Sequence, residues 1–231
     1  MGARDLSGPH PVDVGVVFDR FPASIRGAVL VRGADPDPHQ ITVRAAYLVE
    51  AAEPGRAAAP VEVDQTTVEL APRAEVFFPF DVPVTGLEAG WYGVVAEVVV
   101  DGGIERRSEE PGKLFPVAWP GGTVRRGSVA VGRSIPVPTH GDVVVERLEM
   151  KGDRAIVQWR LPPGTGEEDV SVLADGRPLP LLDRSERHGV RSATVYPVLR
   201  AHRTLAVRFE RIRGADGSWI RGPWDLEIPL P

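Results

Sequence analysis

Apolar runs of strand length recur along the whole chain, and segments rich in glycine, proline and aspartate separate them. The first half holds seven runs that we expect to be strands, at residues 12–18, 26–33, 41–50, 61–70, 74–82, 91–100 and 113–119. Alternation is clearest in the run 61–70, in which every second residue from Val61 to Glu69 lies on one face. Most of the other runs are almost entirely apolar, which is typical of strands that are buried on both faces.

The second half repeats this pattern. Its seven expected strands are 142–151, 154–161, 169–175, 177–183, 192–199, 205–213 and 224–230. Hairpin turns are predicted where residues that tolerate positive φ separate two runs, at 101–102, 151–153, 175–176 and 215–217. The chain shows no sustained helical periodicity, and the segment 181–192 has room for one short helical turn at most.

Regular strands with a turn about every ten residues predict an all-β fold of antiparallel β-sandwiches. A chain of 231 residues suits two such domains in tandem. The glycine-rich segment 120–132 separates the two sets of strands. We therefore expect an N-terminal sandwich over 1–122 and a C-terminal immunoglobulin-like sandwich over 123–231.

The two halves differ in charge. Residues 1–124 carry 10 basic and 18 acidic side chains, a net charge of −8, whereas residues 125–231 carry 17 and 14, a net charge of +3. The halves therefore attract each other or face different partners, unless the difference is simply drift on two solvated surfaces. The chain lacks the strongly basic balance of a nucleic-acid-binding protein, so no nucleic-acid partner is expected.

Composition excludes several kinds of site. The chain has no cysteine, which rules out disulfides, thiolate nucleophiles, zinc–thiolate sites and iron–sulfur clusters. We expect no cofactor. No apolar run approaches the roughly 20 residues of a membrane-spanning helix, so no membrane insertion is expected. No signal peptide is visible at the N-terminus, which predicts a cytoplasmic location.

The segment "LEAGWY" carries a resemblance to a known fold. Leu87, Gly90 and Tyr92 stand in the order L-x-x-G-x-Y, which resembles the tyrosine corner of immunoglobulin-like and fibronectin-type sandwiches. The resemblance implies that the Tyr92 ring packs at the edge of the core and that its hydroxyl binds a backbone group upstream. "VFFPFDVP" at 76–83, followed by the run 91–100, is similar to the first domain of arrestin-like proteins.

The arrestin-like resemblance covers residues 12–118. It implies a binding or scaffolding protein and carries over no catalytic residues.

Catalytic and metal-binding chemistry is weakly represented. The five histidines have no metal-ligand spacing, and no G-x-S-x-G motif exists. His140 is interpreted as a turn residue, and an enzyme would need a pocket between the domains where His140 meets acidic or arginine side chains. Asp35 and Asp37 share one loop and are weak candidates for calcium, but no D-x-D-x-D-G run completes a site. We therefore expect no metal site.

Four tryptophans bear on the choice of function. Trp159 matches the core tryptophan of a sandwich strand. Trp219 follows a turn, where the favoured interpretation is packing between the domains. It is also the best candidate for an exposed aromatic that contacts a sugar or a protein, with Trp224 close to it. Trp91 alternates with Tyr92, so we expect it to face solvent, the second domain or a partner. The candidate binding residues are Trp91, Trp219 and Trp224.

The sequence therefore predicts a non-enzymatic protein-interaction or scaffold protein that uses sheet edges or end loops. A protein partner is expected, and a homo-oligomer is compatible with this interpretation. The alternative is a carbohydrate- or calcium-binding accessory module. That alternative requires Trp219 or Trp224 to be exposed beside polar side chains, or further carboxylates to converge with Asp35 and Asp37.

Overall fold

The computed structural model describes residues 11–21, 23–53, 56–108 and 113–230. Within these residues the regular elements are eighteen β-strands and no helix, which confirms the all-β fold class. Accordingly, the described part of the chain holds no helix of the length and apolarity needed to cross a membrane. The chain divides into two compact units, Met1–Val117 and Ala118–Pro231.

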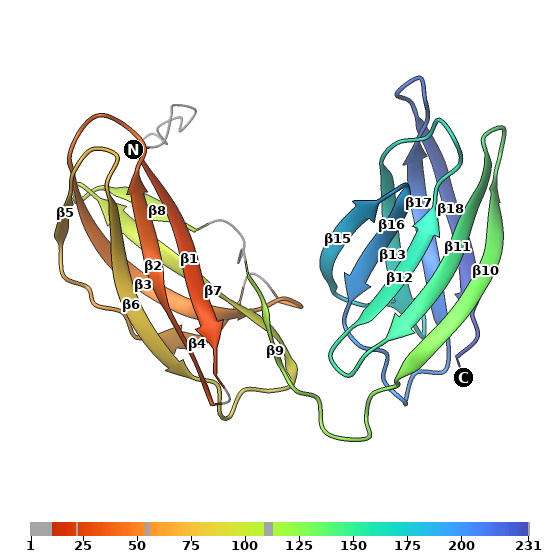
Figure 1. The fold of residues 1–231 in the computed structure, drawn as a ribbon, viewed down its shortest axis with the longest axis horizontal. Coiled ribbons are helices and arrows are strands. Elements are labelled where there is room, and N and C mark those ends of the chain that lie inside the picture. The colour runs from red at the N-terminus through yellow and green to blue at the C-terminus, as the bar shows by residue number, and fades with distance from the viewer. Residues whose placement is uncertain (1–10, 22, 54–55, 109–112, 231) are drawn as a thin grey trace. The chain divides into compact units, whose positions relative to one another are not determined.

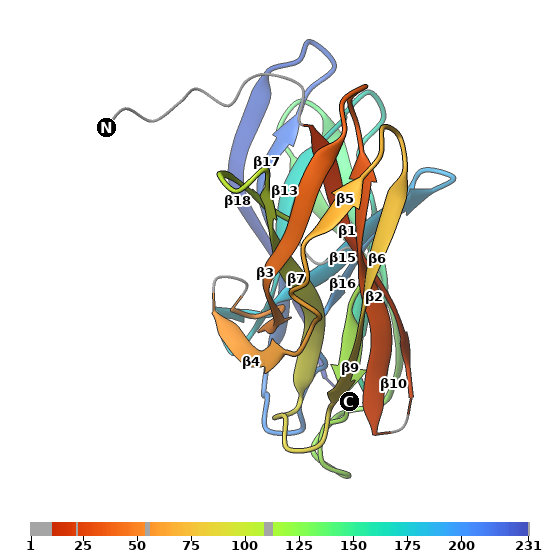
Figure 2. The same cartoon turned by 90° about the vertical axis from the view of Figure 1, so that its left-hand side faces the viewer.

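The first unit consists of two antiparallel sheets packed face to face (Figure 1). One sheet has three strands in the order β1 (Val12–Arg20), β2 (Ser24–Gly33) and β6 (Glu75–Pro83). The other sheet has the order β4 (Ala57–Val61), β3 (His39–Glu50), β7 (Gly90–Val100) and β8 (Ile104–Arg107), with β5 (Val68–Leu70) on β3 and β9 (Phe115–Val117) on β7. Figure 2 shows the same unit from another side.

The second unit also consists of two antiparallel sheets. The larger has the order β10 (Gly127–Val137), β11 (Gly141–Met150), β12 (Ala155–Arg160), β16 (Val190–Val195) and β15 (Leu181–Arg187). The smaller has the order β14 (Arg177–Pro178), β13 (Glu168–Ala174), β17 (Leu205–Arg213) and β18 (Trp219–Ile228). The core between them is centred on Trp159 of β12 and Phe209 of β17, whose rings meet edge to face at 5.8 Å. Trp159 is confirmed as a core residue.

The tyrosine corner is formed as expected. Tyr92 is buried, and its hydroxyl donates a hydrogen bond of 3.2 Å to the backbone carbonyl of Glu88, four residues upstream. The ring lies 6.0 Å from that of Phe115, at the edge of the first unit's core. The bond fixes the chain where it enters β7.

Tyr92→Phe should lower the free energy of unfolding by about 1 kcal/mol, because the buried hydroxyl is lost and the Glu88 carbonyl loses its donor. The measurement is urea unfolding of the full chain, with local unfolding of 87–107 followed by hydrogen exchange. An unchanged unfolding midpoint and unchanged exchange in this segment would contradict the structural role of the corner.

Two of the predicted hairpin turns have the backbone that their residues favour. Asp101 and Gly102, between β7 and β8, have φ of 52° and 69°, and Asp175 and Gly176 have φ of 49° and 76°. Such paired positive φ values suit the twist of a two-residue hairpin. Residues 181–192 hold no helical turn, and a third hairpin turn, at 188–189, joins β15 to β16 there.

Two further expectations are corrected. Residues 61–70 do not form one strand: β4 ends at Val61, and the chain leaves the sheet in a turn where the Thr66 backbone and hydroxyl both donate to the Asp64 carboxylate, at 2.9 Å and 2.6 Å. The segment 120–132 is not a linker throughout, because β10 begins at Gly127. As an edge strand, β10 tolerates proline and a bulge.

The apolar runs differ in how they are buried. Most residues of β7 are buried on both faces, as its sequence predicted. In β6 buried residues alternate with exposed ones, whereas in β1 only Val12 and Phe18 are buried and Val14 and Val16 are partly buried. The other face of the β1–β2–β6 sheet is open. The expectation of burial on both faces is therefore wrong for these strands. Their outward-facing apolar residues form an exposed surface.

Candidate functional site

The outer face of the β1–β2–β6 sheet carries a band of apolar residues. Strand register places them in two adjacent rows, which we name the apolar face: Gly15, Leu30 and Phe77, then Val17, Ala28 and Pro79. Phe77 is 54% exposed and Val17 is 48% exposed, although both side chains are large and apolar. Phe21, at 43% exposed, follows the end of β1. Contiguous exposed apolar residues mark interaction sites more often than single ones do.

Charged rows border the apolar face at both ends. They contain Asp13, Arg32 and Glu75 on one side, and Asp19, Arg26 and Asp81 on the other. Within the rows, Arg26 Nε donates to Asp81 at 2.7 Å and Arg32 Nε donates to Glu75 at 2.7 Å. Because these pairs are exposed, they add little to stability, but they hold the charged side chains in place at the margins of the band.

Gly15 leaves an opening in the apolar face. A Cβ atom added there would meet no heavy atom within 4 Å. Its outward direction follows from alternation, since Val12 and Phe18 of the same strand are buried in the core. A docking side chain could therefore sit at Gly15, beside Leu30.

The β6 edge of the same sheet is less suited to binding than its face. β6 is an edge strand, and it contains Pro79 and Pro83, which have no N–H to donate. Proline on an edge strand hinders the addition of another strand. The geometry therefore favours docking on the face of this sheet over docking at the β6 edge.

The structure separates the three candidate tryptophans. Trp219 is 39% exposed and stacks on the Arg211 guanidinium, 4.5 Å from the ring centroid. Trp224 is half-buried and packs against the core of the second unit. Trp91 is only 6% exposed, so of the three surroundings expected for it (solvent, the second domain or a partner) solvent is excluded. Tyr92 points into the core and Trp91 lies outside that core cluster, which agrees with the predicted alternation.

The loop of Asp35 and Asp37 is organised around a histidine that the sequence analysis passed over. His39 is almost buried, and its two ring nitrogens lie 2.7 Å from an Asp101 oxygen and 2.8 Å from an Asp35 oxygen. The Asp37 N–H donates to the same Asp35 oxygen at 3.1 Å. The described residues contain no group of three or more side chains placed to hold a metal ion. Asp35 and Asp101 thus bind a histidine.

Protonation of His39 should make the first unit's stability depend on pH. Hydrogen bonds to Asp101 and then Asp35 raise the His39 pKa above 6.5, and the same bonds lower the pKa of both carboxyls below 3.8. A raised pKa stabilises the fold fully below pH 6.5, and this contribution is lost as pH rises through the folded-state pKa. The lowered carboxyl pKa values stabilise fully above pH 3.8, and this contribution is lost on acidification.

The hydrogen bonds of His39 with Asp35 and Asp101 should therefore contribute most to the free energy of unfolding between about pH 3.8 and pH 6.5. The check is the difference in free energy of unfolding between the native chain and His39→Gln, measured from pH 3 to pH 9. A difference that does not shrink above pH 7 would contradict a protonated His39.

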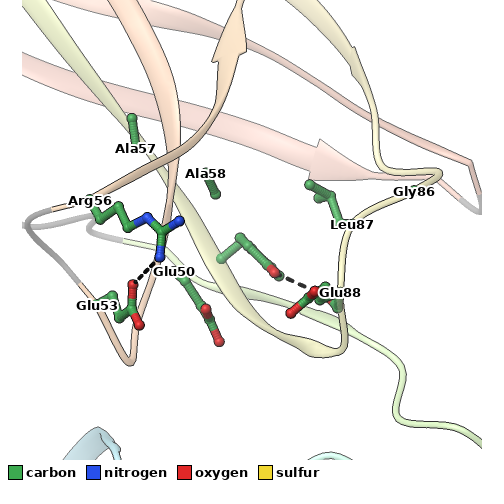
Figure 3. A pocket seen from close by; sticks show the side chains of 9 residues that line it. Glu50, Glu53, Arg56, Ala57, Ala58, Gly86, Leu87 and Glu88 are labelled. Atoms are coloured by element: carbon green, nitrogen blue, oxygen red, sulfur yellow. Dashed lines mark hydrogen bonds and ion pairs between the residues drawn. The ribbon is translucent and has the colours of Figure 1, made fainter.

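A pocket of about 370 Å³ lies next to the tyrosine corner (Figure 3). Glu50, Glu53 and Glu88 line it together with Arg56, whose guanidinium contacts Glu53 at 3.1 Å. Three carboxylates against one guanidinium make the pocket acidic. Tyr92, which also lines the pocket, already donates its hydroxyl to the Glu88 carbonyl in the tyrosine corner.

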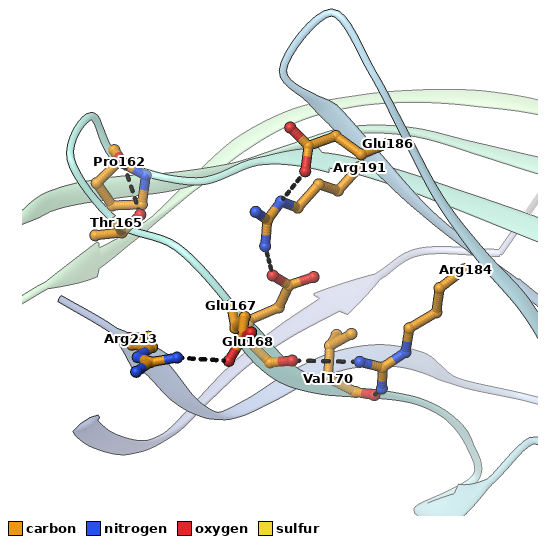
Figure 4. Close-up of polar contacts among 9 residues, drawn as sticks. All are labelled: Pro162, Thr165, Glu167, Glu168, Val170, Arg184, Glu186, Arg191 and Arg213. Atoms are coloured by element: carbon orange, nitrogen blue, oxygen red, sulfur yellow. Dashed lines mark hydrogen bonds and ion pairs between the residues drawn. The ribbon is translucent and has the colours of Figure 1, made fainter. Parts of the chain in front are cut away.

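A polar cluster joins the two sheets of the second unit (Figure 4). Arg191 of β16 contacts Glu168 of β13 and lies 3.1 Å from a Glu186 oxygen of β15. Burial lowers the Arg191 pKa. Arg184 donates to the backbone carbonyls of Glu168 and Val170, at 3.2 Å and 2.9 Å. These groups satisfy one another, which is the arrangement of a structural clamp.

His140 is a turn residue, as expected. Its Nδ1 lies 2.9 Å from the Pro138 carbonyl and 3.0 Å from the Thr139 hydroxyl, within the turn between β10 and β11. The carbonyl can only accept, so Nδ1 carries the proton.

Comparison with known proteins adds little to this geometry. No protein-family model matches the chain, and no curated protein matches it. Among solved structures, it is similar to a conserved domain protein from Bacillus anthracis, with a TM-score of 0.37 and 12% sequence identity over 97% of this chain and 89% of that chain. A likeness of this size carries no argument about function.

The residues of the apolar face were missed from sequence because nothing local distinguishes them from core residues. Phe77 and Phe78 are neighbours of identical type, yet one is 54% exposed and the other is buried. The one usable signal was Gly15 and Pro79 within otherwise apolar runs, since neither residue fills a core well.

Proposed function

We propose that the chain is a non-enzymatic protein-interaction module built from two immunoglobulin-like sandwiches, the first of them, over residues 12–118, of arrestin-like kind. The tyrosine corner supports the immunoglobulin-like part of this proposal. The observation that carries the function is the apolar face, where Phe77 and Val17 are about half exposed between two charged rows.

Covering the apolar face would be favourable. Full burial of a valine or phenylalanine side chain contributes about 1.5–3 kcal/mol relative to exposure, so covering the exposed half of each would contribute about 1 kcal/mol. An apolar centre with a polar rim is the usual anatomy of a protein interface. The charged rows would form that rim.

The polar clusters also favour a non-catalytic role. In the second unit, Arg191 and Glu168 contact each other, and in the loop near β3 both His39 nitrogens are taken by carboxylates. Groups engaged in this way hold the fold together and are not poised to react with a substrate.

The test is affinity capture from the native cell with the full chain as bait. Phe77→Ser removes the large apolar side chain of the face that is 54% exposed, and Leu181→Ser is the matched control because Leu181 is 45% exposed on β15 of the other unit. We expect the same protein to be recovered with the native chain and with Leu181→Ser, and at least tenfold less with Phe77→Ser. Equal recovery with both variants would contradict the proposed surface.

A carbohydrate-binding role is the second candidate, and Trp219 is the observation that favours it. Its ring is 39% exposed and lies beside Arg211, so one apolar ring and polar donors are available together. Glycan binding that Trp219→Ala abolishes and Phe77→Ser leaves unchanged would support this candidate over the first.

A further inference from the structure

We propose that the occupant of the apolar face is a basic, amphipathic segment of another protein, with an apolar stripe bordered by lysine or arginine. This inference rests on the proposed function and adds the chemistry of the partner. The observation behind it is that the apolar face lies between two charged rows in which carboxylates outnumber guanidinium groups.

Charge on this face is negative. The two bordering rows hold four carboxylates and two guanidinium groups, a net charge of −2. Arg26 pairs with Asp81 and Arg32 pairs with Glu75. The excess therefore lies on β1, in Asp13 on one side of the band and Asp19 on the other. Lys113, whose Nζ also donates to the Phe18 carbonyl, lies 3.6 Å from Asp19; both side chains of this pair are more than half exposed, so the pair screens Asp19 only weakly.

The spacing of these two carboxylates sets the spacing expected of the partner's cations. Asp13 and Asp19 are six residues apart along one strand, which at about 3.3 Å per residue is about 20 Å. Between them lie Gly15 and Val17 of the apolar face. A matching segment therefore carries apolar side chains at its centre and basic side chains about 20 Å apart.

The width of the face suits one segment. Three strands about 4.8 Å apart span about 10 Å, which is close to the diameter of one helix with its side chains. Strand addition at the β6 edge is hindered by Pro79 and Pro83. The face therefore fits a segment that lies across the outer surface of the sheet.

A second copy of the chain is a poorer occupant. It would bring the same face of net charge −2 on a unit whose residues 1–117 hold 10 basic and 18 acidic side chains. Like charges brought together at an interface oppose association. A basic partner would instead be attracted, and its association rate would fall as salt is added.

Two glycines provide a matched pair of variants. Gly15 and Gly103 both have open space where a Cβ would stand, and neither has a positive φ. Gly15→Arg should therefore fold normally while placing bulk and positive charge in the opening of the apolar face. Gly103→Arg places the same group beside the β7–β8 turn and serves as the control.

The experiment is selection of 15-residue peptides displayed on phage against the full native chain, with counter-selection against Gly15→Arg. We expect enriched peptides that carry net positive charge together with leucine, isoleucine or phenylalanine. They should bind Gly103→Arg as tightly as the native chain, and Gly15→Arg and Asp13→Lys/Asp19→Lys at least tenfold more weakly. Their affinity should fall between 50 mM and 500 mM salt.

Three results would overturn the inference. Peptides that distinguish Gly15→Arg but are neutral or acidic, and insensitive to salt, would reject the basic partner while leaving the proposed function standing. Self-association of the native chain in sedimentation analysis, abolished by Gly15→Arg, would make a second copy the occupant. If no enriched peptide distinguishes Gly15→Arg and Phe77→Ser also leaves affinity capture unchanged, the proposed function fails with it.

Discussion

Trp159→Ala should lower the free energy of unfolding by about 3–5 kcal/mol, the range found for large aromatic side chains removed from a packed core. Trp159 is 1% exposed and packs edge to face against Phe209, so its removal leaves a cavity that the two sheets cannot close without moving. Among the residues that the structure describes, its indole Nε1 has no hydrogen-bond partner, so the loss comes from packing.

Urea unfolding of the full chain measures this effect, with protection of the second unit followed by hydrogen exchange. Trp219→Ala is the control, because Trp219 is 39% exposed and its loss should change stability by about 0.5 kcal/mol or less. Trp159→Phe should recover much of the loss, since it keeps an apolar ring in the site. Equal destabilisation by Trp159→Ala and Trp219→Ala would contradict the described core.

Arg191→Met should be similarly severe, at about 3–5 kcal/mol, because it leaves a buried carboxylate without its partner. The Glu168 side chain is 6% exposed and that of Arg191 is 20% exposed, so water cannot easily replace the lost contact. Glu168 also lies at the start of β13, whereas Arg191 belongs to β16 of the facing sheet. Loss of this ion pair should therefore weaken the packing of one sheet of the second unit against the other.

The double variant Glu168→Gln/Arg191→Met distinguishes two effects of removing Arg191: the loss of its attraction to Glu168, and the burial of the Glu168 carboxylate without an opposite charge. We expect it to be more stable than Arg191→Met alone, because the neutral amide is cheaper to bury than a lone carboxylate. A double variant no more stable than the single one would show that Glu168 is not the source of the cost.

Local sequence predicted the features that depend on local chemistry. The Asp101–Gly102 hairpin follows from two residues that accept positive φ, and the corner bond from Tyr92 reaches only four residues upstream. The buried strand β7 could be predicted because almost all its residues are apolar. In each case the deciding residues are neighbours in the chain.

Features that depend on distant partners escaped the sequence. His39 acquires its role from Asp101, 62 residues away, because strand register brings Ile41 opposite Val100. From sequence, Phe77 is indistinguishable from a core residue. In the structure, no described residue covers the outer side of β6, so Phe77 is exposed. The pattern of one strand tells which residues share a face, but it does not tell whether that face is covered.

Pro79 and Pro83 also affect the tendency of this chain to aggregate. A sheet with an open apolar face and an unpaired outer strand has the two ingredients of fibril growth, stacking of faces and edge-to-edge extension. The prolines deny β6 the regular ladder of donors that extension needs, so this edge of the sheet is a poor template for aggregation even though the neighbouring face is apolar and exposed.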